Sequence, residues 1–442
     1  MMSKEAIKVL WLFLVWCSLG LYLEIPGPTL IDIKLLFNSS FEDVSRSVSG
    51  RGAGGFTGAV IGGIFADRFS HALDLFVAVS ETIAGFAIMA VPYSFSVHTL
   101  WFHYFTLGAC GGVIGIAGVR TVITMWPDKT ASTLQLLHVG YGMGALLVPL
   151  IVNPFLAIID YSQNKAGNQD SDKLVVIEGT SVQYAFVGIG LTSLLLSIVF
   201  YRYHWERPSS QGYKPVVTDT STVDTKNLTF GEMINPATYA NGQFKYGCYI
   251  LLVLAVYFFF MVGGEEVYGN FVRSFSVEVF AFTKTQASYL NMVFWLGLTI
   301  GRLFWAVVSG YSSVKRIFAI QVILHTIATT LLNLYAASNP VMLWLCTAAE
   351  GFLVSPLYPG GIAYGNTLIE ITGIILMVMN FAASCGDLSF IWMAGKLYDS
   401  FGPRSVLYAL QLVGIVLIVC LVLLRIGERY TKHRPKLIGN ST

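Results

Sequence analysis

The sequence predicts an all-α membrane protein whose twelve transmembrane helices form two six-helix bundles. Three observations predict it: repeated apolar stretches, a low charge content and a polar interruption near the middle of the chain. Each stretch has about 20 to 25 residues, which as a helix crosses a hydrocarbon core of about 30 Å. Because the backbone cannot bond to water inside lipid, and the stretches lack strand-like alternation, each stretch must be helical.

Composition agrees with this class, since 55% of the residues are hydrophobic and 12% are charged. About a quarter of the residues of a soluble protein are charged. We expect the spans at residues 8–31, 46–66, 72–92, 99–126, 131–157, 181–201, 244–268, 285–310, 316–336, 340–364, 370–395 and 403–425.

The chain divides at a polar segment. Residues 204–243 are rich in Ser, Thr, Asp and Lys and have no apolar periodicity, which indicates a flexible linker. We therefore expect a first bundle over residues 1–203 and a second bundle with a tail over residues 244–442. Two six-helix halves that begin on the same side of the membrane are typical of transporters.

The distribution of Lys and Arg predicts the orientation. Sixteen lie on the side of the termini and the linker, and eight lie on the opposite loops, so both termini should be cytoplasmic. The first apolar stretch lacks a small-residue cleavage site and is interpreted as a retained helix rather than a signal peptide. Asn38 begins an Asn-Ser-Ser sequence on an outer loop and is the expected glycosylation site.

The sequence has no motif that indicates an enzyme class. The Gly-x-G-x-x-G pattern at Gly50 starts a membrane helix and follows no strand, so we interpret it as helix packing and expect no enzyme activity. The same helix carries Gly54, Gly58 and Gly62 on one face, and residues 111 and 115 of the fourth span are also glycines. Small residues at such intervals allow two helix backbones to approach closely.

Charged residues inside spans are the main candidates for function, because each costs about 2.5–3.5 kcal/mol near the bilayer centre. They are Glu24, Arg51, Arg120, Glu265, Arg302, Glu350 and Asp387.

Depth along the helices sorts these charges. We expect Glu24 and Arg51 to form an ion pair, because they lie at similar depth on consecutive helices. Glu265 and Asp387 then have no basic partner at their depth, and two carboxylates in one cavity suit Na⁺ or a bound proton. Arg302 is expected at a different depth, in the inner half. A structural pairing between two helices remains the alternative for each residue.

Polar side chains in the spans are candidates for contact with a solute. Gln135 and His138 lie three apart on one helix face and suit sugar hydroxyls, although a lone His is often only a packed residue. Asn380 shares a face with Asp387 in the eleventh span. Trp295 is placed to stack on a sugar ring, with ordinary core packing as the alternative.

One motif carries a family resemblance. The second span ends in Gly62-Gly63-Ile64-Phe65-Ala66-Asp67-Arg68-Phe69, which resembles the Gly-x-x-x-Asp-Arg pattern of the major facilitator superfamily. Further matches to its sodium-dependent glucose transporter branch, and to fucose permease, are Gly27-Pro28-Thr29, Gly50-Arg51, Trp126, Asp128-Lys129, Gln135, Leu137-His138, Gly263, Glu265, Tyr268-Gly269, Phe294-Trp295, Arg302, Pro359 and Gly361.

The resemblance implies a transporter that moves a small polar solute, most simply a hexose, by alternating access. The candidate substrate contacts are Gln135, His138 and Trp295, which match the family, and Arg120 and Asn380, which are chosen from their places in the spans. For ion or proton coupling the candidates are Glu265, which matches the family, Asp387, which stands where the family usually has Glu, and Glu24 and Glu350, which stand where it usually has uncharged residues. The resemblance suggests Arg51, Asp67, Arg68 and Arg302 for gating or structure.

This chain also departs from the family. It lacks the polar residues expected near Gly115 and Val119 and has Arg120 beside them, so an organic anion is an alternative solute. A sensor or scaffold that transports nothing is the second alternative. We expect a monomer in the plasma membrane, bound to lipid and not to nucleic acid, with no cofactor other than Na⁺ as a possible coupling ion.

Overall fold

The computed structural model describes residues 4–125, 130–160, 175–206, 235–308, 311–371 and 373–432. The first half contains α1 Lys4–Glu24, α2 Pro26–Phe37, α3 Phe41–Val48, α4 Gly50–Arg68, α5 Leu73–Ala90, α6 Val97–Met125, α7 Thr130–Val152 and α8 Gln183–Trp205. The second half contains α10 Pro236–Tyr239, α11 Phe244–Phe280, α12 Lys284–Val308, α13 Val314–Leu331, α14 Pro340–Val354, α15 Leu357–Asn366, α16 Gly373–Phe401 and α17 Ser405–Lys432.

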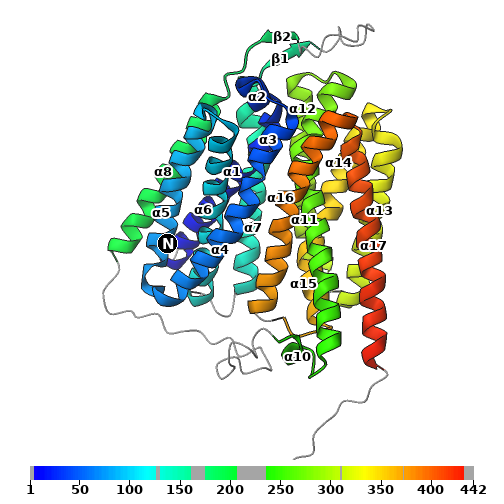
Figure 1. The fold of residues 1–442 in the computed structure, drawn as a ribbon. Helices are drawn as coiled ribbons and strands as arrows, with labels where there is room; N and C mark the ends of the chain where they lie inside the picture. The colour runs from blue at the N-terminus through cyan, green and yellow to red at the C-terminus, as the bar shows by residue number, and fades with distance from the viewer. Residues whose placement is uncertain are drawn as a thin grey trace, which may run out of the picture.

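The helices form two bundles that lie side by side (Figure 1). In the first bundle α4 packs on α6, α5 on α8 and α1 on α7; in the second, α11 packs on α16, α12 on α14 and α13 on α17. The start of α1 and the end of α17 lie toward the same end of the molecule as α10, opposite the strands β1 Ile158–Asp160 and β2 Val175–Glu178 (Figure 1). These strands pair antiparallel, and the sequence did not predict them.

The structure confirms an all-α membrane protein. Eleven described helices or helix pairs are long and apolar enough to span a membrane. The twelfth expected span is α4, whose many glycines lower its hydropathy and which lies along α6 through the first bundle (Figure 1). The outward faces are apolar as well, as at Leu195 of α8 and Val422 of α17, which are 67% and 52% exposed. Lipid is the solvent that such faces require.

Several predicted bounds need correction. The first span is two helices, because Pro26 lacks a backbone N–H and begins α2 as a new helix after Ile25. The tenth is likewise divided, into α14 and α15, at Ser355 and Pro356. The seventh continues to Phe280, well beyond the predicted end at 268. Its second part contains polar residues, and most of these are buried in the protein. Most of the predicted linker, residues 207–234, lies outside the described residues.

Glycines bring α4 against α6. A Cβ placed on Gly54 or on Gly58 would lie 1.9 Å from a carbonyl oxygen of α6, so only glycine fits at this separation. The packing role expected for these two residues is therefore confirmed. The same role expected for Gly111 and Gly115 of α6 is not found: Gly108 and Gly112 face α4, whereas a Cβ on Gly115 would meet nothing within 4 Å.

Candidate functional site

A cavity of about 170 Å³ lies between the two bundles. Helices α1, α4, α6 and α7 of the first bundle contribute to its wall, together with α11 and α16 of the second. The lining residues are Leu23, Glu24, Arg51, Gly52, Gly55, Gly108, Gly111, Gly112, Tyr141, Glu266, Ser384 and Asp387.

Arg51 of α4 is the centre of the charged groups in this cavity. Its Nη2 lies 3.2 Å from Oδ1 of Asp387 and donates a hydrogen bond to Glu266. Its Nη1 lies 3.6 Å from Oε1 of Glu24 and donates to the carbonyl of Leu23 at 2.5 Å. The pair expected between Glu24 and Arg51 is present. It is one part of a larger cluster, because Arg51 also contacts two carboxylates of the second bundle.

Neighbouring helices hold the carboxylates in place. Tyr141 of α7 donates a hydrogen bond to Glu24, and Asn270, one turn further along α11, donates to Glu266 at 3.4 Å. Tyr141 can reach Glu24 because α7 lies very close to α1: a Cβ on Gly144 would be 2.1 Å from the carbonyl oxygen of Cys17. The glycine contacts between helices thus set the geometry of the cluster.

The cluster carries more negative than positive charge. Arg51 is always protonated in proteins, so three ionised carboxylates around it leave a formal surplus of two negative charges. The side chains of Arg51, Glu24, Glu266 and Asp387 are between 2% and 16% exposed. A buried surplus charge is unstable, so the site favours a bound cation or protons on the carboxylates.

The prediction of which acidic residue of α11 lines the cavity was wrong. We expected Glu265 and Asp387 in one cavity without basic partners, but Asp387 pairs with Arg51, and the cavity residue is Glu266. Glu265 instead has an oxygen 3.9 Å from Nη2 of Arg302 on α12, so the expectation that it has no basic partner was wrong. Neighbouring helical residues point about 100° apart, and the direction that faces the other bundle is not encoded within one helix.

Glu350 of α14 does not line the cavity. It lies inside the second bundle, where its Oε1 is 3.4 Å from Nδ1 of His325 on α13. A partner for Glu350 at His325 was not predicted, because one histidine in an apolar stretch does not indicate which residue it contacts.

None of the expected solute-binding residues whose side chains the structure describes lines the cavity. His138 of α7 has an exposed side chain, and the positive charge of Arg302 is close enough to interact with it electrostatically. Asn380 is exposed and accepts a hydrogen bond from Tyr358, and Arg120 of α6 is also exposed. Trp295 is 2% exposed and packs in the core against Phe294, which corresponds to the core-packing alternative. The side chain of Gln135 lies outside the described residues.

The remaining predicted residues are at the ends of the bundle. Arg68 is exposed, with its guanidinium 5.9 Å from the centre of the Phe69 ring. The Asp67 side chain lies outside the described residues, so its predicted gating contact stays a prediction. Asn38 is exposed and ends α2 in a left-handed conformation with φ 44°.

Polar contacts close the two bundles together at the end near β1 and β2. Asp399 of α16 accepts hydrogen bonds from the backbone N–H groups of Phe41 and Glu42, at 3.3 and 2.7 Å, where α3 begins. A buried ion pair joins Asp32 of α2 to Arg273 of α11 at 3.4 Å. These contacts were not predicted.

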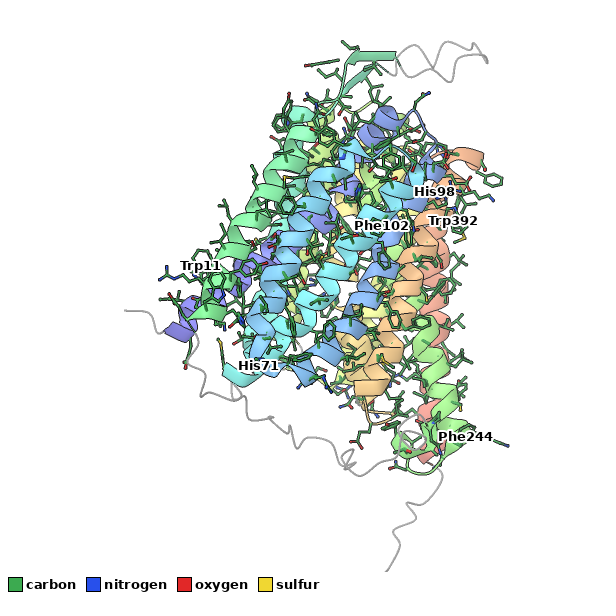
Figure 2. All side chains as sticks on the ribbon, turned by 60° about the vertical axis from the view of Figure 1, so that its left-hand side comes forward. Trp11, His71, His98, Phe102, Phe244 and Trp392 are labelled. Atoms are coloured by element: carbon green, nitrogen blue, oxygen red, sulfur yellow. The ribbon has the colours of Figure 1, made fainter. Side chains whose placement is uncertain are left out.

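A tryptophan also lies at this end of the molecule, near β1 and β2, which we call the closed end. Trp392 lies on the part of α16 near α3, whereas Phe244 is at the opposite end of the molecule (Figure 2). The indole N–H of Trp392 donates to Glu42 at 3.4 Å. Several contacts between the bundles therefore lie at the end of β1 and β2.

No family model matches the chain. Among known proteins it is similar to human sodium-dependent glucose transporter 1, with 25% identity over 87% of this chain and 72% of that protein. Mouse sodium-dependent glucose transporter 1A is 23% identical over 88% and 89%. Major facilitator superfamily domain-containing protein 4A of Xenopus tropicalis is 24% identical over 97% and 95%.

Solved transporter structures share the fold at low identity. A nucleoside transporter has a TM-score of 0.64 with 13% identity over 96% of this chain and 100% of its own. A bacterial homologue of the human lysosomal transporter Spinster, in an inward-facing and unoccupied conformation, has 0.64 with 12% identity over 98% and 99%. The E. coli fucose:proton symporter has 0.57 with 12% identity over 96% and 99%. The chain is thus an integral membrane protein with the major facilitator fold, and it resembles the sodium-dependent glucose transporters of that superfamily.

Proposed function

We propose that this protein transports a hexose such as glucose across a membrane by alternating access, driven by Na⁺. The observation that carries the proposal is the cluster of Arg51 with three carboxylates from both bundles around one cavity. Such a cluster joins the bundles through charge, so a cation that binds there changes how firmly they hold together. The names of the relatives suggest the hexose and sodium.

The carboxylates differ in how well they are satisfied. Glu24 and Glu266 each accept a hydrogen bond from a second side chain as well as contacting Arg51. Among the described residues, Asp387 has a polar contact with Arg51, and its side chain, which lines the cavity, is 12% exposed. Carboxylate and hydroxyl oxygens are the ligands that hard cations prefer, and Ser384 lies one turn away on the same wall. We therefore assign the coupling cation to Asp387, with Glu266 as its neighbour.

The charge of the cavity argues against the organic anion alternative. Three ionised carboxylates around one arginine repel an anionic solute, and Arg302 of α12, a second cation, already has Glu265 within 3.9 Å. A neutral sugar is compatible with this field. In the arrangement we propose, both termini are cytoplasmic, the closed end faces outward at the plasma membrane, and the protein is a monomer.

The test is uptake of labelled glucose into proteoliposomes with and without an inward sodium gradient. With equal pH on both sides of the membrane, wild type is expected to accumulate glucose only with the sodium gradient, and Asp387→Asn is expected to lose that dependence. The matched control is Asp43→Asn, which removes a carboxylate of an exposed pair with Arg46 at the closed end and should leave sodium dependence intact.

Glucose uptake that ignores sodium and follows a pH gradient would replace Na⁺ by a proton at the same carboxylates. Uptake that is abolished by an excess of an organic anion would favour the anion alternative. No uptake of any labelled hexose by a protein that elutes as a single folded species would refute the proposed function and favour the sensor or scaffold.

A further inference from the structure

The second bundle contains a buried acid–histidine pair that the cavity does not use. Nδ1 of His325 lies 3.4 Å from Oε1 of Glu350, and each side chain is 2% exposed. Neither ring nitrogen of His325 has a hydrogen-bond partner among the described residues, nor does Oε2 of Glu350. Oε1 of Gln321, one turn before His325 on the same face of α13, also has none there. Four buried polar atoms are therefore left unsatisfied along one side of α13.

A buried pair of a histidine and a glutamate can bind one proton in place of a net negative charge. Without the proton it consists of a neutral imidazole and a carboxylate, with one buried negative charge. With the proton it is an imidazolium and a carboxylate, or an imidazole and a carboxylic acid, and its net charge is zero. Gaining the proton also converts one unsatisfied nitrogen or oxygen into a donor for its neighbour. Buried charges and buried unpaired polar groups are both destabilising, so the protein around the pair favours the protonated form.

The surrounding groups connect this pair to the central part of the molecule. The charge of Glu265 on α11 reaches Glu350, and Glu265 has Arg302 of α12 beside it. The other titratable groups whose interaction with Glu350 is evident are Tyr268 of α11 and Cys346 of α14.

Of the other helices packed on α13, α15 and α17 also carry the titratable groups Tyr358 and Cys420, and their paired charged groups lie at the far end of α13. Lys315 pairs there with Glu428 of α17, beside Arg425, and Tyr364 of α15 also contacts Glu428. At about 1.5 Å per residue, ten residues place Lys315 about 15 Å from His325 along α13. Glu265 is therefore the charged neighbour that matters.

We propose that His325 and Glu350 form a proton-binding site in the second bundle, whose occupancy is linked to the charge at Glu265. An anionic Glu265 favours the proton on the pair, and neutralisation of Glu265 by Arg302 or by a cation favours its release. By linkage, the proton on the pair must favour the anionic form of Glu265 to the same degree. The transport part of this proposal rests on the proposed function: the site adds a proton-dependent step to sugar movement.

The first experiment measures the proton directly and needs no transport. The protein is labelled with ¹³C-histidine, and the His325 signal is identified by its loss in His325→Gln. In wild type we expect this signal to titrate within the pH range in which the protein stays folded. In Glu350→Gln its midpoint should fall by at least about one pH unit, a tenfold loss of proton affinity, because the anion that favours the imidazolium is gone. In Glu350→Asp the midpoint should stay near that of wild type.

His103 supplies the matched control. It lies on α6, half-buried, with Nδ1 2.9 Å from Oγ of Ser94, and it belongs to the other bundle. His103→Gln should leave the titration of His325 unchanged. A His325 signal that does not titrate in this range, or a midpoint that Glu350→Gln does not move, would overturn the proposal, because a merely structural pair predicts both.

The second experiment tests the linkage to transport. Proteoliposomes with equal sodium on both sides receive an inward proton gradient of one pH unit, which drives at most about a tenfold accumulation of a neutral sugar by one proton. We expect accumulation by wild type and Glu350→Asp, and none by Glu350→Gln or His325→Gln. Accumulation that survives in Glu350→Gln overturns the proposal. If wild type moves no hexose under any gradient, the proposed function fails instead, and the titration alone decides the proton site.

Discussion

Neutralising Arg51 should damage the protein in a way that neutralising Glu24 as well does not repair. For an isolated buried pair, removal of one partner costs about 3–5 kcal/mol because a charge is left uncompensated, and removal of both recovers much of that loss. Arg51 is not in an isolated pair. When Arg51→Gln is combined with Glu24→Gln, the carboxylates of Glu266 and Asp387 still lack their cation.

The expected magnitudes follow from these contacts. Glu24→Gln should cost about 1 kcal/mol or less, because Gln can still accept from Tyr141 and the surplus negative charge falls. Arg51→Gln should cost about 3–5 kcal/mol, and the double variant about the same. Only the further changes Glu266→Gln and Asp387→Asn should restore most of the stability, since they remove the last uncompensated charges.

The assay is thermal unfolding of the purified protein in detergent, followed by tryptophan fluorescence. A loss of this size lowers the midpoint by on the order of 10 °C in a domain the size of one bundle. The control is the exposed pair of Asp43 and Arg46, whose neutralisation should change stability by about 1 kcal/mol or less. A double variant of Glu24 and Arg51 that is clearly more stable than Arg51→Gln alone would refute the shared cluster and favour a simple pair.

Three further predictions concern packing, closure and orientation. Gly58→Val should lower the stability of the folded protein by about 1–3 kcal/mol or more, because its Cβ would meet a carbonyl oxygen of α6 at 1.9 Å. The control Gly63→Ala faces open space and should be neutral, and the yield of monodisperse protein measures both. Asp399→Ala removes the acceptor for the first N–H groups of α3, worth about 1 kcal/mol, and should shift the closed end toward opening about fivefold, seen as longer distances between spin labels on α3 and α16; unchanged distances would contradict this. Asn38→Gln should abolish a glycan mass shift in a eukaryotic membrane, and a shift that persists would contradict the predicted orientation.

Properties of single helices could be predicted well from the sequence. Most span bounds agree with the structure within a few residues, and the expected contact of Glu24 with Arg51 is present because the two lie on consecutive helices. The glycine face of α4 was also identified correctly. Each of these features depends on the periodicity of one helix or on the proximity of chain neighbours.

Features that depend on how the two bundles meet could not be predicted. Glu266 was overlooked beside Glu265, because the rotation of α11 toward the first bundle is set by packing far away in the chain. Asp399 as a cap for α3, and Arg273 as a partner for Asp32, are separated from their partners by hundreds of residues. The polar part of α11 also hid the true length of the helix, since most of its polar residues are buried in the protein and do not face lipid.

These long-range contacts divide into two kinds with different consequences for transport. Asp399 and the pair of Asp32 with Arg273 hold the closed end, and they lie outside the cavity residues. Arg51 both bridges the bundles and lines the cavity, so it is the contact that a bound cation changes. In the proposed mechanism, a cation at Asp387 competes with Arg51 for the same carboxylate and weakens the bridge, which favours separation at the closed end. Linkage then requires that separation raise the affinity for the cation. The closed end therefore sets the stability of this state, and we expect Arg51 to make that stability respond to the coupling ion.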